Sequence, residues 1–140
     1  MFDLQDYRFS LLAIGLILVL VIVQWVVATV SKGRLPDAVP GYPPKDQNHH
    51  SFVFRAYRTH QNTLENLGLM LGGGFFAILA GANPSWVTGL LFTILIARVI
   101  HMILYYVIGT ERNPSPRSYF FIIGWLANVV LVGMGIFALF

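Results

Sequence analysis

The chain has 140 residues, of which 56% are hydrophobic and only 11% are charged, and its formal net charge at pH 7 is +3. A soluble domain carries about 25% charged residues, so this composition excludes a water-facing globule, and we expect lipid rather than nucleic acid as its surroundings. The chain contains no cysteine, which excludes disulfides and thiolate metal sites, so any reactive thiol must come from a ligand. Its length predicts a single domain over residues 1–140.

Four apolar stretches are long enough to cross a membrane, for which a helix needs about 20 residues. They cover roughly residues 9–30, 52–82, 86–108 and 118–140. So few strands could not close a barrel and satisfy their backbone in lipid. The predicted fold class is therefore an all-α membrane protein, a four-transmembrane-helix bundle. The first stretch exceeds the apolar region of a signal peptide, about 7–15 residues, and is expected to be a retained helix.

Proline and glycine mark the connections between these helices. The segment 31–51 contains four prolines, which exclude a continuous helix. Between the second and third helices, Asn83-Pro84-Ser85 predicts a tight turn with Ser85 as the N-cap. Within the second helix, Gly68 and Gly72 form a pair of small residues one turn apart, which favours close approach by another helix.

Positive charge is concentrated in the first and third connections and at their edges. The 83–85 turn and the C-terminus carry no basic residue, so the positive-inside rule places both loops in the cytoplasm and both termini outside. The short chain suggests a multi-pass protein of a bacterial inner membrane. Seven of the nine basic residues lie in or beside the two loops: Lys32, Arg34, Lys45, Arg55, Arg58, Arg112 and Arg117.

Polar residues form stripes on the second and third helices. Ionisable side chains within a membrane are costly, so each is a functional candidate. At about 100° per residue, the stripe of the second helix covers an arc of about 100° and that of the third about 60°. Two stripes on consecutive helices indicate one shared interior site. The two stripes are Arg55, Arg58, Asn62, Glu65 and Asn66, and Arg98, His101 and Tyr105.

Depth pairs one residue of each stripe. Counted from the outer turn at about 1.5 Å per residue, Glu65 and Arg98 lie at similar heights, roughly 20–24 Å along their helices. Because opposite charges on neighbouring helices are tolerated better than a lone charge, we predict a salt bridge between them. On the same count, Asn62 lies near His101 and Tyr105, toward the cytoplasmic end.

The fourth helix begins with a cation and a hydroxyl. Pro116 suits the first position of a helix, and Arg117 and Ser118 follow it. The N-terminal end of a helix favours anions. Together with Arg58, these residues predict a cytoplasm-facing pocket for a small anionic ligand that carries carboxylates.

Purely structural interpretations remain open for these residues. Arg55 and Arg58 could be snorkelling side chains, Glu65 with Arg98 could only stabilise the bundle, and Tyr105 could belong to an interfacial aromatic belt. The pair His49 and His50 is expected to be ordinary loop residues. Interhelical hydrogen bonding is expected of two further amides, Gln24 and Asn128.

Three motifs resemble those of a known family. The segment Arg58-Thr-His-Gln-Asn62-Thr-Leu-Glu65-Asn66 resembles the Arg-x-x-x-Asn-x-x-Glu-Asn/Thr signature of the MAPEG family, the membrane-associated proteins in eicosanoid and glutathione metabolism. The spacing Arg98-x-x-His101-x-x-x-Tyr105 resembles the third-helix motif of microsomal prostaglandin E synthases and related glutathione transferases. The pair Arg117-Ser118 is similar to the Arg-Ser pair of those enzymes. The resemblance covers nearly the whole chain and suggests a prokaryotic member.

The resemblance implies a homotrimer of four-helix bundles, with glutathione bound at each subunit interface on the cytosolic side. Arg117 would stabilise the glutathione thiolate with help from Ser118. Gln61 stands where the prostaglandin synthase has another arginine, and Arg34 is aligned with a family arginine that contacts glutathione. The implied binding residues are Arg34, Arg58, Gln61, Asn62, Glu65, His101 and Tyr105.

The implied activity is that of a microsomal glutathione S-transferase, with peroxidase activity, acting in detoxification. Glutathione would be the co-substrate, no metal is implied, and the partner would be a hydrophobic or lipid electrophile arriving from the membrane beside helices one and four. Guanidinium groups suit the carboxylates of glutathione, and a nearby cation lowers the pKa of its thiol. The alternatives are a glutathione-dependent lipid isomerase or synthase, a non-catalytic lipid-binding adaptor like the lipoxygenase-activating protein, and a small transporter.

Overall fold

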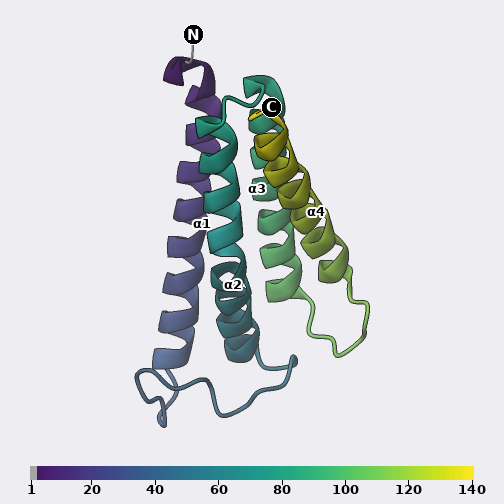
Figure 1. Cartoon of the computed structure of the whole chain (residues 1–140). Helices are drawn as coiled ribbons and strands as arrows, with labels where there is room; N and C mark the ends of the chain where they lie inside the picture. Colours follow the sequence, from purple (N-terminus) through teal and green to yellow (C-terminus); the bar gives the residue numbers. More distant parts are fainter. Residues whose placement is uncertain (1–2) are drawn as a thin grey trace.

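The protein is a bundle of four long helices, described over residues 3–140 by a computed structural model. A short 3-10 turn, η1 (Leu4–Tyr7), leads into the helices. The described part contains no strand. The α1–α2 and α3–α4 loops lie at one end of the bundle, and η1, the end of α4 and the α2–α3 turn lie at the other (Figure 1). The helices are α1 (Arg8–Gly33), α2 (Phe52–Leu79), α3 (Pro84–Val107) and α4 (Pro116–Phe137).

The turn between α2 and α3 is built by specific end residues. Gly81 adopts a positive φ of 74° just after α2, a conformation that glycine tolerates at helix C-termini. Asn83, rather than the predicted Ser85, is the N-cap of α3, because its Oδ1 accepts from the backbone N–H of Ser85 at 3.1 Å and of Trp86 at 3.3 Å. Pro84 then takes the first helical position, which its fixed φ favours.

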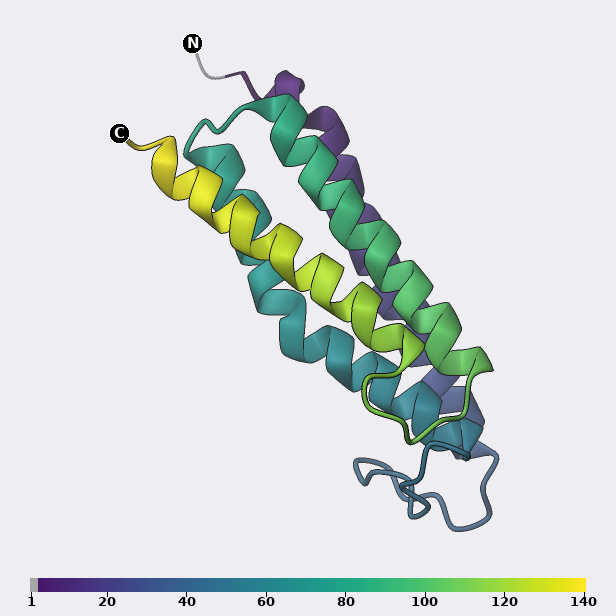
Figure 2. The ribbon, with the colours of Figure 1, turned by 90° about the vertical axis from the view of Figure 1, so that its right-hand side faces the viewer.

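The core lies where α2 and α3 meet the other two helices. Both α2 and α3 pack against α1 and α4, which lie on opposite sides of them (Figures 1 and 2). A Cβ at Gly74 would lie 3.1 Å from Leu91 and 3.3 Å from Ile14, so a glycine lets α2 approach both neighbours closely. The largest fully buried apolar side chains are Ile17, Met70, Ile78, Leu91, Ile94 and Leu131.

The predicted close approach at Gly68 and Gly72 does not occur within the chain. A Cβ at either position would meet nothing within 4 Å among the described residues. Both glycines instead lie on the exposed face of α2. This face is therefore open to lipid or to another molecule.

Three of the four helices are long and apolar enough to cross a membrane by themselves: Leu4–Gly33, Pro84–Val107 and Pro116–Phe137. The second helix falls short of this criterion, because its first half carries the predicted polar stripe. It nevertheless runs alongside the other helices for most of their length (Figure 2). Many large apolar side chains on the three apolar helices face outward, including Ile22, Trp25 and Val130. The chain is an integral membrane protein.

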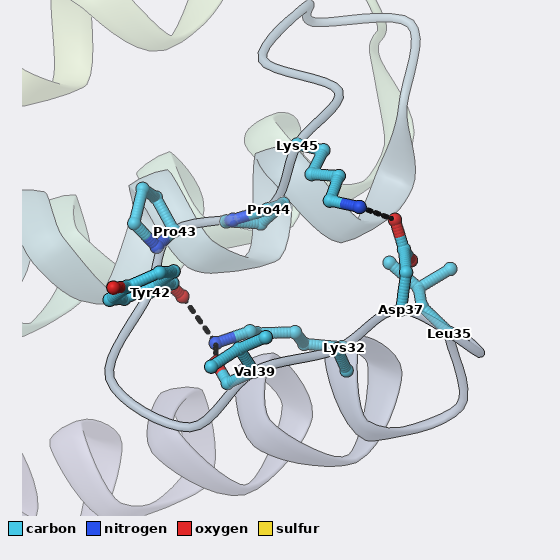
Figure 3. Close-up of a pocket in the computed structure, with 9 residues that line it drawn as sticks. Lys32, Leu35, Asp37, Val39, Tyr42, Pro43, Pro44 and Lys45 are labelled. Carbon is cyan, nitrogen blue, oxygen red and sulfur yellow. Dashed lines mark hydrogen bonds and ion pairs between the residues drawn. The ribbon is translucent and has the colours of Figure 1, made fainter.

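The α1–α2 loop folds around Lys32 at the end of α1. Its Nζ donates to the Val39 carbonyl at 2.7 Å and to the Tyr42 carbonyl (Figure 3). Lys45 pairs with Asp37 at 2.8 Å, and this contact lowers the pKa of Asp37 below its usual range. The hollow enclosed by these residues is only about 40 Å³, so we assign the group to holding the loop rather than to binding a ligand.

Candidate functional site

A cavity of about 360 Å³ lies between α2, α3 and α4 near the loop end of the bundle. It brings together five of the predicted site residues, from three helices that are far apart in the sequence. The aromatic ring of Phe121 and the side chain of Ile122 complete its wall. The predicted residues that line it are Asn62, His101, Tyr105, Arg117 and Ser118.

Arg117 is the cation of this cavity, and its position is fixed on two sides. Its guanidinium carbon lies 4.1 Å from the centre of the Tyr105 ring, a cation–π contact. Its Nη2 donates to the Thr110 carbonyl at 3.3 Å. Arg117 occupies the first turn of α4, where the helix dipole also favours a negative charge. The cavity therefore offers an anion a guanidinium and a helix N-terminus together.

Ser118 shares its hydroxyl between the cavity and the start of α4. Its Oγ accepts from the Ser115 backbone N–H at 3.2 Å and lies 3.0 Å from the Ser115 Oγ. This capping-box arrangement satisfies a backbone donor at the helix end. Ser118 thus holds the turn that carries Arg117, besides lining the cavity.

The stripe on α3 points into the bundle as predicted, since Arg98, His101 and Tyr105 are all buried. The His101 ring contacts Tyr105 edge-on, with ring centres 5.4 Å apart. Two lining residues keep buried polar atoms that have no hydrogen-bond partner within residues 3–140, namely Asn62 Oδ1 and His101 Nδ1. Because buried polar atoms are normally paired, these two are suited to bind a polar ligand.

The predicted salt bridge between Glu65 and Arg98 is not formed. Arg98 Nη2 donates instead to Thr63 Oγ1 at 3.1 Å, in the bundle interior. Glu65 pairs with Arg58 at 3.3 Å, on the outer face of α2, where their side chains are 54% and 36% exposed. Residues two apart on a helix point about 200° apart, so Thr63 rather than Glu65 contacts Arg98 directly, although the Glu65 carboxylate is still close enough to act on the Arg98 charge. The prediction failed because it considered the depth of the two residues along their helices but not the face of α2 on which Glu65 lies.

The remaining predicted site residues lie outside the cavity. Arg58 and Glu65 flank Asn62 on the same face of α2 but stand beyond the cavity wall. Gln61 lines a groove between α1 and α2, together with Tyr57 and His60. Arg34 is exposed at the end of α1. The structure thus divides the predicted constellation into one cavity, one neighbouring ion pair and two separate residues.

Arg55 is buried and anchors the first loop. It is therefore not a snorkelling residue, which was one of the interpretations open from the sequence. Its Nη1 donates to the carbonyls of His49 and His50, both at 2.8 Å, and its Nη2 donates to the Tyr106 carbonyl at 3.2 Å. One guanidinium therefore joins the end of the first loop to the last turn of α3. Arg55 therefore holds the loop beside the cavity but does not line the cavity itself.

His49 and Glu111, which sequence reasoning did not place in the site, join the two loops above the cavity. The His49 backbone N–H donates to Glu111 Oε1 at 2.6 Å, and its ring Nδ1 lies 2.9 Å from Glu111 Oε2. Its other ring nitrogen lies 3.0 Å from the Tyr105 hydroxyl. These contacts from His49 hold the pKa of Glu111 below its usual range. His49 is therefore not the ordinary loop residue that the sequence led us to expect. The only sequence signal for this contact was the prediction that both loops lie on the same side of the membrane.

An apolar groove of about 380 Å³ runs between α1 and α3. Sequence reasoning expected the path of a hydrophobic partner beside helices one and four, but these helices lie on opposite sides of the described chain. Nine side chains line the groove: Leu16, Val19, Leu20, Val23, Leu95, Ile96, Val99, Ile100 and Met102.

Comparison with known proteins gives one result. A family model, that of the MAPEG family, matches residues 9–137, which include α2, α3, α4, all of α1 except its first residue, and every residue that lines the cavity. Searches among curated proteins and among solved structures found no match. The match spans nearly the whole chain and agrees with the three motifs, so the chain belongs to the MAPEG family.

Proposed function

We propose that the protein is a glutathione-dependent membrane transferase, with peroxidase activity, that activates the glutathione thiolate against hydrophobic electrophiles. The family includes glutathione transferases and related enzymes, and also non-enzymes. The observation that supports an enzyme here is the cavity in which Arg117, at the N-terminus of α4, faces the same space as Tyr105 and Ser118. An anionic sulfur would find a cation, a helix end and hydroxyl groups there.

The chemistry of the neighbouring groups suits the rest of the tripeptide. Glutathione carries two carboxylates and one ammonium group, so it needs cations and at least one carboxylate. Arg58 and Glu65 supply one of each beside the cavity, and Asn62 offers a buried amide oxygen between them. In the proposed reaction, the thiolate attacks the electrophilic carbon, a sulfur–carbon bond forms, and the leaving group departs with the bonding electrons.

The open face of α2 supports a further part of the proposal, the homotrimer. The ion pair of Arg58 and Glu65 is partly exposed on that face, where Gly68 and Gly72 leave room. Charged groups and bare backbone are unfavourable against lipid, so a second copy of the chain is a better cover. We further propose that the loop end, with its basic residues, faces the cytoplasm of a bacterial cell.

The apolar groove between α1 and α3 favours an alternative in which a lipid is the main ligand. Its lining is entirely apolar and its volume is about 380 Å³, so it suits a hydrocarbon chain. A lipid isomerase or synthase would use both the groove and the thiol, whereas an adaptor would use the groove alone. Product analysis after incubation with glutathione and a lipid hydroperoxide or epoxide separates these alternatives from a transferase.

The decisive experiment replaces the proposed thiolate-stabilising cation. A thiolate about 4 Å from a guanidinium gains about 4 kcal/mol at an effective dielectric constant of about 20. The cavity is open to water, so we expect a smaller effect on the bound thiol, about one to two pKa units. Arg117→Ala should therefore lose the ultraviolet absorbance of the thiolate near pH 7, while the Kd for glutathione in calorimetry rises less than about tenfold.

The matched control is Arg112→Ala, which removes the same charge from an exposed residue of the preceding loop, outside the cavity. It should retain both the thiolate absorbance and the Kd. Retention of the absorbance in Arg117→Ala would disprove the role of Arg117. A wild-type protein that neither binds glutathione nor forms the thiolate would disprove the proposed function itself.

A further inference from the structure

Three side chains form a continuous hydrogen-bonded chain from the cavity to the surface of the protein. Tyr105 lines the cavity, and its hydroxyl lies 3.0 Å from His49 Nε2. His49 Nδ1 lies 2.9 Å from Glu111 Oε2, and the Glu111 side chain is 55% exposed. The three residues come from α3, the first loop and the last loop. The chain thus begins at a buried hydroxyl and ends at a solvated carboxylate.

Glu111 fixes the tautomer of His49. A carboxylate only accepts hydrogen bonds, so the ring Nδ1 that contacts it must carry the proton. In the neutral imidazole, Nε2 is then unprotonated and accepts from the Tyr105 hydroxyl. The second Glu111 oxygen accepts from the His49 backbone N–H at 2.6 Å, which holds the ring in place. The Tyr105 hydroxyl therefore donates its only proton to His49, and its oxygen can accept a hydrogen bond from a ligand in the cavity.

We propose that the chain Tyr105–His49–Glu111 is a proton relay that takes the proton from a thiol bound in the cavity. This inference rests on the proposed function, because it requires a thiol ligand. The thiol proton passes to the Tyr105 oxygen as the Tyr105 proton passes to His49 Nε2. One S–H bond and one O–H bond break, one O–H bond and one N–H bond form, and no electrons are gained or lost. His49 becomes an imidazolium beside the Glu111 carboxylate, and the thiolate remains beside Arg117.

The charges around His49 suit this exchange. Glu111, from the last loop, stabilises the imidazolium directly, and Arg55, from α2, contacts the His49 carbonyl rather than its ring. His50 is the adjacent titratable residue of the loop and is exposed. Arg117, from α4, stacks on the opposite partner, Tyr105. His49 thus acts through Tyr105 and is a positioning residue, whereas Tyr105 touches the bound thiol.

The test variant is His49→Gln, because glutamine can hydrogen-bond to both neighbours but cannot take a proton. General bases accelerate proton transfer about 10²–10⁴-fold, and His49 acts through an intermediate hydroxyl. We therefore expect the rate of thiolate appearance, followed by stopped-flow absorbance with glutathione, to fall about ten- to hundredfold. The pH profile of this rate should differ between the wild type and the variant, because only the wild type has a side chain at this position that can take the proton.

The matched control is His50→Gln, which makes the same change one residue away, at an exposed side chain. It should keep the wild-type rate and pH profile. The relay is overturned if His49→Gln keeps the wild-type pH profile. This holds whether the rate is unchanged or falls together with glutathione affinity and thermal stability, because a merely structural role of His49 predicts such a result.

A second measurement needs no thiol and keeps this inference separate from the proposed function. Nitrogen-15 NMR of labelled histidine should show His49 protonated at Nδ1 at neutral pH, with the assignment made by the His49→Gln variant. Glu111→Gln should shift that proton toward Nε2, because an amide N–H can donate to Nδ1. Protonation of His49 at Nε2 in the wild type would overturn the relay, even if glutathione binds. A wild type without thiolate but with the Nδ1 tautomer would instead refute the proposed function.

Discussion

Replacing Gly135 by alanine tests the packing of α4 on α2 most directly. An added Cβ would lie 2.7 Å from two carbon atoms of the Phe76 ring and 3.2 Å from the Cα of Ala77. Ordinary carbon–carbon contacts are about 3.5–4.0 Å, so either the ring or the helix must move by up to about 1 Å. The ring of Phe76 is only half-buried and can yield, but Ala77 is fully buried and its Cα belongs to the backbone.

The expected cost follows from two opposing effects. Overpacking a tight contact costs about 1–3 kcal/mol, while alanine is more favourable than glycine in a helix by about 1 kcal/mol. Gly133→Ala, two residues earlier in α4, isolates the second effect, because its Cβ would meet nothing within 4 Å. The free energies of unfolding of the two variants should therefore differ by about 1–3 kcal/mol, with Gly135→Ala the less stable.

Thermal unfolding in detergent, followed by circular dichroism, measures this difference. For a domain of this size, 1 kcal/mol corresponds to roughly 3 °C in Tm, so Gly135→Ala should unfold roughly 3–9 °C below Gly133→Ala. Adding Phe76→Ala should reduce the gap between the two alanine variants, since removal of the ring frees the space. Equal Tm values for the two single variants would show that α4 does not cross α2 as described.

Three further predictions concern the helix ends, the interior and the loops. Asn83→Ala should lower the Tm by roughly 3 °C, because an N-cap contributes about 1 kcal/mol, whereas Ser85→Ala should leave it unchanged. Thr63→Val should cost about 1–3 kcal/mol of unfolding free energy in urea titration, because it leaves a buried donor of Arg98 unpaired. The pKa of Glu111 is lowered in the folded protein, so its contacts stabilise the loops above the ordinary carboxyl pKa and are lost as pH falls through the depressed value. The NMR signal of its partner amide should therefore titrate only below the ordinary carboxyl range.

Each of these has a control in the same chain. Thr93→Val removes an exposed hydroxyl that bonds only within its own helix, so it should cost much less than the buried substitution; an equal cost would argue against the buried Arg98 contact. Glu111→Gln should abolish the titration at the His49 amide, and a titration at the ordinary carboxyl pKa in the wild type would argue against the loop contact. A Tm unchanged by the Asn83 substitution would remove it as the N-cap.

The sequence predicted the helices and the centre of the site well, because both depend on local spacing. The long apolar runs place the four helices within a few residues of their observed bounds. His101 and Tyr105 are four apart on one helix, so they share a face wherever that helix lies. Arg117 and Ser118 open a helix after a proline, which fixes them at its N-terminus. These short-range rules place each pair on one face of its own helix, and the packing of α3 against α4 then brings the four residues to one cavity.

Errors arose where a prediction needed the rotation of one helix against another, or the path of a loop. Depth alone paired Glu65 with Arg98, but the rotation of α2 presents Thr63 instead. His49 reaches Glu111 across 62 residues of sequence, through loops whose conformations no periodicity specifies. The N-cap of α3 was within reach of sequence reasoning, because a proline at the first helical position makes the preceding Asn83 the cap.

Two separate cations hold the first loop, one at the part that follows α1 and one at the part that precedes α2. Lys32 donates hydrogen bonds to the carbonyls of Val39 and Tyr42, whereas Arg55 donates to the carbonyls of His49 and His50. We therefore expect that the part around Val39 and Tyr42 can be lengthened or exchanged, as for a fluorescent label or an affinity tag, without disturbing the cavity. The part that ends at His49 and His50 is joined to the last turn of α3 through Arg55, so a graft placed there should disturb the cavity.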